Sequence, residues 1–326
     1  MSNYIWVSLT IFAIELIYFR IADHFNIIDK PNMRSSHTHI TLRGGGVIFT
    51  IGMWLYAAFF GVEYIWFLIG LTAISAVSFT DDVHSVPNWV RLTVQFAAML
   101  LMFYQWGILA TDSWWQIIIA LIFCTGIINA FNFMDGINGI TGSYSLAVLV
   151  PLIVVNHYAP FIEDSLLWVA VLSVLVFCFF NFRTKAKCFA GDVGAVGIAF
   201  ILIFALGKLV IQTGSLWYIV FMAVYGVDVV LTILHRIMLK EKLGEAHRKH
   251  AYQIMANELH IPHVVVSSIY LVLQLLVSAG AIWLPINKWL YLAVVLIVLS
   301  TAYVLFMKKK YHLHREYLEA QNAITK

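Results

Sequence analysis

Long apolar segments recur along almost the whole chain, and they restrict its fold more than any other feature. Segments such as 193–211 and 263–284 have about 18 or more mostly apolar residues, the length that spans a bilayer. Only 11% of the 326 residues are charged, whereas soluble domains carry roughly 25%. The sequence therefore excludes a water-soluble globule and predicts one integral-membrane domain over residues 1–326.

The apolar segments are expected to be helices, because backbone in lipid must form its hydrogen bonds within its own segment. They are too long for barrel strands. The first segment has no basic residue before it and no small-residue cleavage site after it, so we interpret it as a retained span rather than a signal peptide. We predict an all-α polytopic protein of about eleven transmembrane helices, at approximately 4–22, 45–62, 64–80, 90–106, 114–131, 142–156, 165–181, 193–211, 216–235, 263–284 and 288–307.

Basic residues predict the orientation of these spans. All but two of the 20 lysines and arginines fall in connections on one side; Lys288 lies on the other side and Lys208 inside a span. The basic side is cytoplasmic by the positive-inside rule, which places the N-terminus outside and the C-terminus inside. The net charge of +3 is too small to indicate nucleic-acid binding. Polar and Gly-rich sequence also gathers in the cytoplasmic loops, where we expect the chemistry: about 23–44, 81–89, 132–141, 182–192 and 236–262.

Two of these loops carry carboxylates beside an apolar segment. Asp81 and Asp82 are adjacent, and such a repelling pair usually has a divalent cation or a basic group beside it. Asn129, Asn132 and Asp135 are spaced three apart, which places them on one face if the helix continues through them. The structural alternative for Asp81 and Asp82 is a solvated pair of loop acids, and for the second motif it is a polar helix end followed by a glycine turn.

A third loop joins a basic run at 183–187 to Phe189 and Asp192. The basic run has two interpretations of similar weight, a topology signal or a contact for phosphate or anionic lipid. Asp192 comes where a helix begins, so it is either the helix N-cap or a metal ligand that needs the other carboxylates nearby.

Two further loops contain candidate phosphate contacts. His247 and His250 are three apart and would share one helical face, but Arg248 and Lys249 between them oppose a cation and suit a diphosphate better. A basic cytoplasmic loop is the alternative. Arg43 precedes three glycines that resemble a phosphate-cradling helix start, without the spacing of a P-loop or a dinucleotide fingerprint.

In their order along the chain, Asp81-Asp82, Asn129-x-x-Asn132-x-x-Asp135-Gly136, Phe189-x-x-Asp192 and the His247–His250 segment resemble the polyprenyl-phosphate N-acetylhexosamine-1-phosphate transferase superfamily, glycosyltransferase family 4. The resemblance covers roughly residues 29 to 253. The superfamily includes enzymes that start common-antigen, O-antigen and teichoic-acid synthesis, and the translocase that makes peptidoglycan lipid I.

The resemblance implies roles for particular residues. Asp81, Asp82 and Asp135 would be catalytic, and Asp192 with Asp135 and Asp82 would bind Mg²⁺, with Mn²⁺ as the alternative ion. Phe189 would stack on uracil. The substrate-binding residues would be Asn129, Asn132, Gly136, Asn138, Phe189, Arg43, His247, Arg248 and His250. Asn138 departs from most bacterial members, which have an aspartate there, so this position has no role as an acid or base.

The implied reaction transfers a sugar 1-phosphate from a UDP-activated N-acetylated hexosamine to undecaprenyl phosphate and releases UMP. The resemblance also implies a multi-pass protein of the bacterial inner membrane that initiates a cell-surface polysaccharide and contacts membrane lipid; it leaves a homodimer open. The His247–His250 segment resembles the O-antigen and capsule initiators more than the peptidoglycan translocase, which is the alternative within the family.

Two other classes of protein compete with this interpretation. A secondary transporter predicts internal repeats and polar groups near the bilayer midplane. Among charged residues, only Glu15, Lys208 and Asp228 lie well inside predicted spans rather than at their ends, and no repeat is evident. A non-catalytic membrane scaffold would not need acids and amides gathered on one face.

Overall fold

A computed structural model describes residues 2–31, 36–110, 114–242 and 247–324. Arg34, Glu245 and Ala246, which belong to predicted cytoplasmic loops, lie outside these residues. The described chain is helical apart from one antiparallel pair, β1 (Ile28–Asp29) with β2 (Thr41–Leu42), so the predicted all-α class is confirmed. The helices are α1 (Ser2–His24), α2 (Val47–Phe60), α3 (Ile65–Val83), α4 (Asn88–Trp106), α5 (Trp114–Met134), α6 (Ile140–Tyr158), α7 (Asp164–Asn181), α8 (Gly191–Thr213), α9 (Ala223–Met238), α10 (Ala251–Gln253), α11 (His263–Trp283) and α12 (Lys288–Ile324).

The chain is a multi-pass membrane protein. Each predicted span coincides with a helix, and α9 continues a 3₁₀ segment at Leu216–Met222. Within the described ranges, nine helices are long and apolar enough to cross a membrane. α2, with 14 residues, is a shorter apolar helix, and α4 is not among the nine. The count of eleven crossings and the orientation of the termini therefore stay predictions.

Helix α8 lies at the centre of the bundle. It is apolar on all sides, a pattern that favours a helix surrounded by protein, and Val193 to Leu206 are buried without interruption. Gly46 and Gly194 allow α2 to approach it, because a Cβ on either glycine would overlap the other backbone. By contrast, α5 and α12 expose large apolar side chains such as Ile122 and Ile297, as expected for lipid-facing helices.

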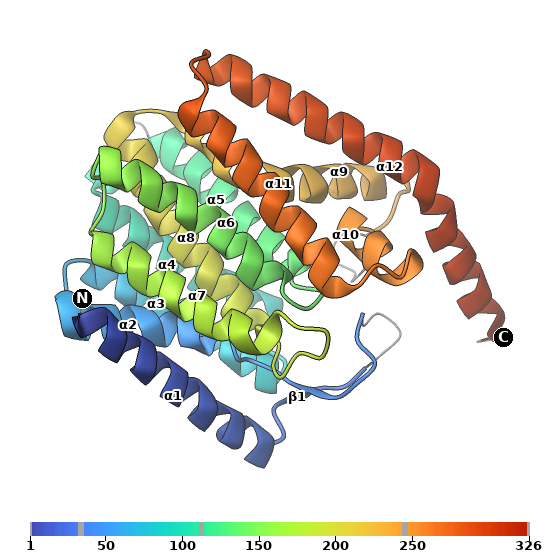
Figure 1. Cartoon of the computed structure of the whole chain (residues 1–326), viewed down its shortest axis with the longest axis horizontal. Helices are drawn as coiled ribbons and strands as arrows, with labels where there is room; N and C mark the ends of the chain where they lie inside the picture. The colour runs from blue at the N-terminus through green and yellow to red at the C-terminus, as the bar shows by residue number, and fades with distance from the viewer. Residues whose placement is uncertain (1, 32–35, 111–113, 243–246, 325–326) are drawn as a thin grey trace.

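The loops with the candidate residues gather at one end of the bundle. In Figure 1 this is the lower right-hand end, where the β1 segment, the loop after α7 and α10 come together; the two termini lie at opposite ends. One helix extends there beyond its predicted span. The last helix contains the span 288–307 and continues to Ile324, since its polar sequence keeps good helix formers such as Lys, Glu and Ala.

Candidate active site

The hairpin of α3 and α4 brings an arginine back to the paired aspartates. Asp81 and Asp82 lie in the last turn of α3, and Arg91 lies in the first turn of α4, after a connection of only His84–Pro87. Arg91 Nη1 lies 2.6 Å from Asp81 Oδ2, while Asp81 Oδ1 accepts a hydrogen bond from the Val86 N–H at 2.7 Å. A basic group therefore stands beside the repelling pair.

Asp82 caps the central helix from outside its own segment. Its oxygens accept hydrogen bonds from the N–H groups of Asp192 (2.9 Å) and Val193 (3.0 Å), at the start of α8. Arg43 Nε adds an ion pair with Asp82 Oδ1 at 2.6 Å. The interpretation of Asp192 as its own N-cap is wrong, since α8 shows no side-chain cap and Asp82 satisfies these amides.

Asp192 is thereby left to face two arginines. Arg43 Nη2 lies 3.1 Å from Asp192 Oδ1, and Arg91 Nη2 lies 3.0 Å from Asp192 Oδ2. Each arginine thus bridges Asp192 to one member of the Asp81–Asp82 pair. The side chains of Arg43 and Arg91 are about a third exposed, at 33% and 30%, so the arginine side of this cluster borders the solvent.

Asp135 adds a carboxylate from a third segment to Asp81, Asp82 and Asp192. Helix α5 continues through Asn129 and Asn132 and ends at Met134, one residue before Asp135, so the predicted helical face holds the two asparagines but not Asp135. Burial raises the pKa of Asp135 to about 7, opposed by the Thr141 hydroxyl, which donates to Oδ1 at 2.6 Å. The negative charges of Asp192 and Asp82 raise this pKa further.

The three glycines after Arg43 serve packing rather than phosphate binding. The N–H of Gly45 donates to the Phe189 carbonyl and that of Gly46 to the Ala190 carbonyl, so both amides are already used. These bonds tie the first loop to the segment that carries Phe189 and Asp192. Gly191, at a φ of +70°, has a conformation that favours glycine, and a Cβ there would also crowd the Asp82 carboxylate.

The donor atoms at this site suit a hard divalent ion, since Mg²⁺ prefers carboxylate oxygens. Asp192 and Asp81 contact each other, two arginines and one backbone amide, and the arginine contacts can be exchanged for an ion or a phosphate. Asp82 is less available, because helix capping and Arg43 use both of its oxygens. In the part of the chain that the structure describes, no three His, Cys, Asp or Glu side chains already stand in a metal-binding arrangement.

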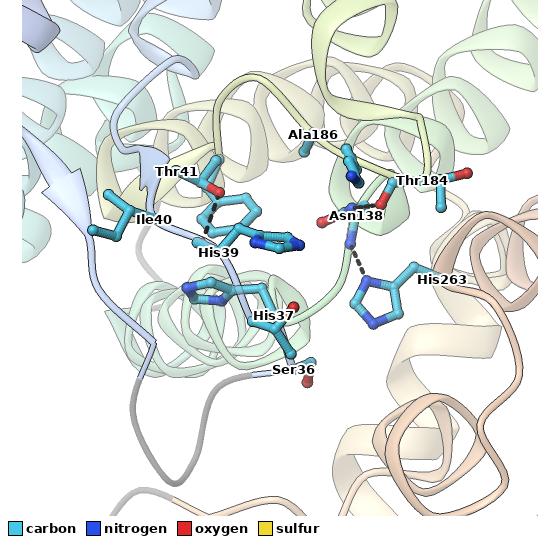
Figure 2. Close-up of a pocket in the computed structure, with 12 residues that line it drawn as sticks. Ser36, His37, His39, Ile40, Thr41, Asn138, Thr184, Ala186 and His263 are labelled. Carbon is cyan, nitrogen blue, oxygen red and sulfur yellow. Dashed lines mark hydrogen bonds between the residues drawn. The ribbon is translucent and has the colours of Figure 1, made fainter.

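Beside the charged cluster lies a pocket of about 380 Å³. Figure 2 shows His37 and His39 of the first loop on one side, with Asn138, Thr184 and His263 across from them. The ring of Phe189, which also lines the pocket, contacts the His37 ring edge to face at 4.7 Å between centroids. The complete list of lining residues is Ser36, His37, Thr38, His39, Ile40, Thr41, Asn138, Thr184, Lys185, Ala186, Phe189 and His263.

The amide of Asn138 has a fixed orientation in this pocket. Its side-chain nitrogen donates to the carbonyls of Arg183 (3.0 Å) and Thr184 (3.1 Å), and its backbone N–H donates to His263 Nδ1 at 3.4 Å. With both amide hydrogens used, the side chain offers only Oδ1, an acceptor, to a ligand. Asn138 therefore offers a ligand one neutral acceptor and no charge.

The histidine loop has a different shape from the predicted one. His247 and His250 do not share a helical face, because the short helix α10 begins only at Ala251. Their rings nevertheless lie 5.0 Å apart. Burial, together with the neighbouring His250, lowers the pKa of His247 to about 3, so its imidazole is neutral at physiological pH.

The two basic residues of that loop are engaged with acidic partners. Arg248 Nη2 lies 3.5 Å from Glu258, and its guanidinium stacks over the Tyr317 ring of α12 at 4.6 Å. Lys249 pairs with Glu241. To reach a diphosphate, Arg248 would have to leave these partners; its substrate-binding role stays a prediction.

Sequence patterns missed several residues of the site. Arg91 was counted only as a topology signal, although its place in the first turn after a short connection could have indicated its return to Asp81. His37, Thr141 and His263 gave no signal, because only the folded loops bring them to the site.

Comparison with known proteins gives two kinds of match. The model of the glycosyl transferase family 4 matches residues 64–210, which contain Asp81, Asp82, Asp135 and Asp192. A probable undecaprenyl-phosphate N-acetylglucosaminyl 1-phosphate transferase of Bacillus subtilis is 25% identical over 304 residues, 85% of each chain.

Two further relatives match shorter regions. The undecaprenyl-phosphate α-N-acetylglucosaminyl 1-phosphate transferase of Escherichia coli K12 is 26% identical over 226 residues, 61% of this chain and 60% of that protein. A phospho-N-acetylmuramoyl-pentapeptide-transferase of Deinococcus radiodurans is 34% identical over 109 residues, 33% of this chain and 31% of the other. These matches confirm the predicted resemblance to the superfamily of polyprenyl-phosphate N-acetylhexosamine-1-phosphate transferases.

Proposed function

We propose that this protein transfers the sugar 1-phosphate of a UDP-activated N-acetylated hexosamine to undecaprenyl phosphate. An oxygen of the lipid phosphate attacks the β-phosphorus of the donor, the bond from that phosphorus to the oxygen bridging to the α-phosphate breaks, and UMP leaves with that oxygen. The reaction would take place at the cytoplasmic face of a bacterial inner membrane and initiate a cell-surface polysaccharide.

The observation that carries this proposal is the junction of Asp81, Asp82 and Asp192 with Arg43 and Arg91 at one end of a membrane bundle. Both reactants are anionic, and the transfer mainly requires their charges to be neutralised and their atoms aligned. A single arginine can donate two parallel hydrogen bonds to two oxygens of one phosphate, which fixes the orientation of that phosphate. Arg43 and Arg91 can therefore release carboxylates to receive the donor diphosphate and the lipid phosphate.

A divalent ion, Mg²⁺ or Mn²⁺, would be held by Asp192 with Asp135, and it would offset the negative charge of the donor phosphates. Asp82 would support this set by fixing the start of α8, through its bonds to the Asp192 and Val193 amides. Asp81 would orient the lipid phosphate through Arg91. A strong base is unnecessary there, since a phosphate monoester has its second pKa near 6 and is largely ionised at neutral pH.

The pocket beside the cluster would take the uridine of the donor. The Phe189 ring offers a flat apolar surface on which a base can stack. Asn138 Oδ1, held as an acceptor, suits the imide N–H of uracil. Both groups lie on the segments that also carry Asp192 and Asp135, so base and diphosphate would be bound side by side.

The test is release of UMP by the purified protein with Mg²⁺, undecaprenyl phosphate and a panel of UDP-sugars that includes UDP-N-acetylmuramoyl-pentapeptide. We expect release with an N-acetylated hexosamine donor and none when the lipid acceptor is omitted. Release with the pentapeptide donor alone would favour the peptidoglycan-type activity. No release with any donor would overturn the enzymatic interpretation.

A further inference from the structure

A carboxylate buried in helix α9, Asp228, is hydrogen-bonded to the histidine loop and to two other helical side chains. Asp228 is only 3% exposed. Its Oδ1 accepts hydrogen bonds from His250 Nδ1, from the Ala251 N–H and from the Thr232 hydroxyl, each at 3.2 Å. Its Oδ2 accepts a short hydrogen bond of 2.5 Å from the Tyr270 hydroxyl on α11.

This arrangement determines which nitrogen of His250 is available. Because the carboxylate can only accept, His250 Nδ1 must carry a hydrogen, and the ring then presents Nε2 on its opposite side. His250 is 1% exposed, and its Nε2 has no hydrogen-bond partner among the described residues. Buried polar atoms without protein partners are rare in folded proteins, and such an atom is free to bind a ligand or a water.

Neighbouring rings prevent the imidazole from turning away. His250 stacks on Tyr252 at 5.7 Å between centroids and lies 5.0 Å from the His247 ring. The Tyr252 hydroxyl in turn donates to the Phe133 carbonyl at 2.9 Å, at the end of α5. The position of the ring is thus determined by both α9 and the histidine loop.

The same contacts place the His250 loop beside the turn that carries Asp135. A Cβ on Gly136 would overlap the Tyr252 hydroxyl, so the histidine loop packs directly on the turn that carries Asp135. Arg248 and Lys249 are engaged with Glu258 and Glu241. Imidazole nitrogens, rather than these cations, are therefore the groups that the loop offers next to Asp135.

We infer that Asp228 is a positioning residue that holds His250 with Nε2 directed at the diphosphate of the donor. This inference rests on the proposed transfer of a sugar 1-phosphate. When His250 is protonated, Asp228 balances its charge, and Nε2–H donates a charge-assisted hydrogen bond to a phosphate oxygen. Asp228 itself does not touch the substrate.

A double-mutant cycle on the full-length protein in detergent tests this role. We expect Asp228→Asn and His250→Gln each to lower kcat/KM for the UDP-sugar by about 10²-fold, with KM for undecaprenyl phosphate unchanged. The double variant is expected to be no slower than His250→Gln, because Asp228 acts only through His250. Losses that multiply in the double variant would overturn the inference.

Thr232→Val is the matched control. It removes another donor to the same carboxylate at nearly constant volume and leaves His250 untouched, so we expect kcat/KM to stay within about threefold of wild type. A loss in Thr232→Val as large as that in Asp228→Asn would assign Asp228 a structural role and overturn the inference.

A second measurement does not depend on turnover. In ¹⁵N NMR of histidine-labelled protein, His250→Gln identifies the His250 signals among those of the 12 histidines. We expect the neutral form of His250 in the wild type to carry its hydrogen on Nδ1, and Asp228→Asn to shift that hydrogen toward Nε2. An unchanged tautomer would overturn the inference even in an active enzyme, whereas the expected shift without UMP release would locate the failure in the proposed function.

Discussion

Two charged regions at the loop end of the bundle balance their charges in different ways. In the aspartate–arginine cluster, Arg43 and Arg91 bridge carboxylates from separate segments and remain about a third exposed. In the histidine loop, Arg248 and Lys249 pair with Glu258 and Glu241, and buried Asp228 holds His250.

The difference indicates that the aspartate–arginine cluster exchanges partners with substrates, whereas the histidine loop keeps its ion pairs. In the first region the arginines border water, but the carboxylates that they face are only 0 to 16% exposed, so an arginine can exchange partners only where a metal ion or a phosphate replaces the charge that it loses. In the second region, Glu258 and the Arg248 side chain are nearly buried, with 4% and 11% exposed. Breaking such a pair leaves an uncompensated charge, so this region is expected to remain fixed while substrates bind.

Removal of divalent ions would have the largest effect on the first region. An excess of chelator is expected to lower UMP release by at least about 10³-fold, since a metal ion contributes several kcal/mol of transition-state stabilisation. Adding Mg²⁺ or Mn²⁺ in excess should restore the rate. Turnover that persists in the chelator would show that the two arginines alone neutralise the phosphates.

The next largest effect is expected for Asp192→Asn. The amide keeps the shape of the side chain but loses the charge that faces both arginines and would hold the ion, so turnover is expected to fall by about 10²- to 10³-fold. UMP release measures this. Asp23→Asn, at an exposed position near the end of α1, is the control and should match wild type. Equal rates for both variants would remove Asp192 from the mechanism.

Arg91→Gln tests the exchangeable ion pairs. Loss of a charged hydrogen-bonding group costs about 1.5–3 kcal/mol, so kcat/KM is expected to fall by about 10- to 100-fold. Steady-state kinetics with varied donor and varied lipid shows which substrate Arg91 binds. Arg20→Gln on the exposed face of α1 is the control. A loss of thermal stability without a loss of kcat/KM would assign Arg91 a structural role.

The same substitution in the second region is expected to have the smallest effect on turnover. Arg248→Gln should leave kcat within about twofold of wild type but lower the unfolding temperature, because Glu258 then loses one of its partners. Thermal unfolding and UMP release measure the two effects. A rise in KM for the donor without a change in stability would support the donor-binding role predicted from the sequence.

The residue types of the site were predictable, and their partners were not. Asp81, Asp82, Asp135 and Asp192 were recognisable because acids beside apolar segments are costly and persist for a reason. That Asp82 caps α8 depends on packing between two helices that are more than 100 residues apart in sequence, which no local pattern reports. Asp192 was therefore misinterpreted as a possible cap.

Asn138 and the histidine loop show the same limit. The residue type of Asn138 suggested only that an acid is missing at this position. The hydrogen bonds from its side-chain nitrogen to the carbonyls of Arg183 and Thr184 show that Oδ1 is the atom left to accept a hydrogen bond. The spacing of His247 and His250 predicted one helical face, but α10 begins after them, and Tyr252 and Asp228 determine their positions instead.

By itself the sequence determined the membrane helices, their approximate limits and the loops that carry the polar residues, because the cost of placing polar groups in lipid acts on each segment separately. The tertiary structure alone decided which polar groups meet. Ion pairs such as Arg91 with Asp192, and the hydrogen bond that joins Asp228 to His250, depend on distances between segments far apart in the chain. The packing of the helices, and not local propensity, determines those distances.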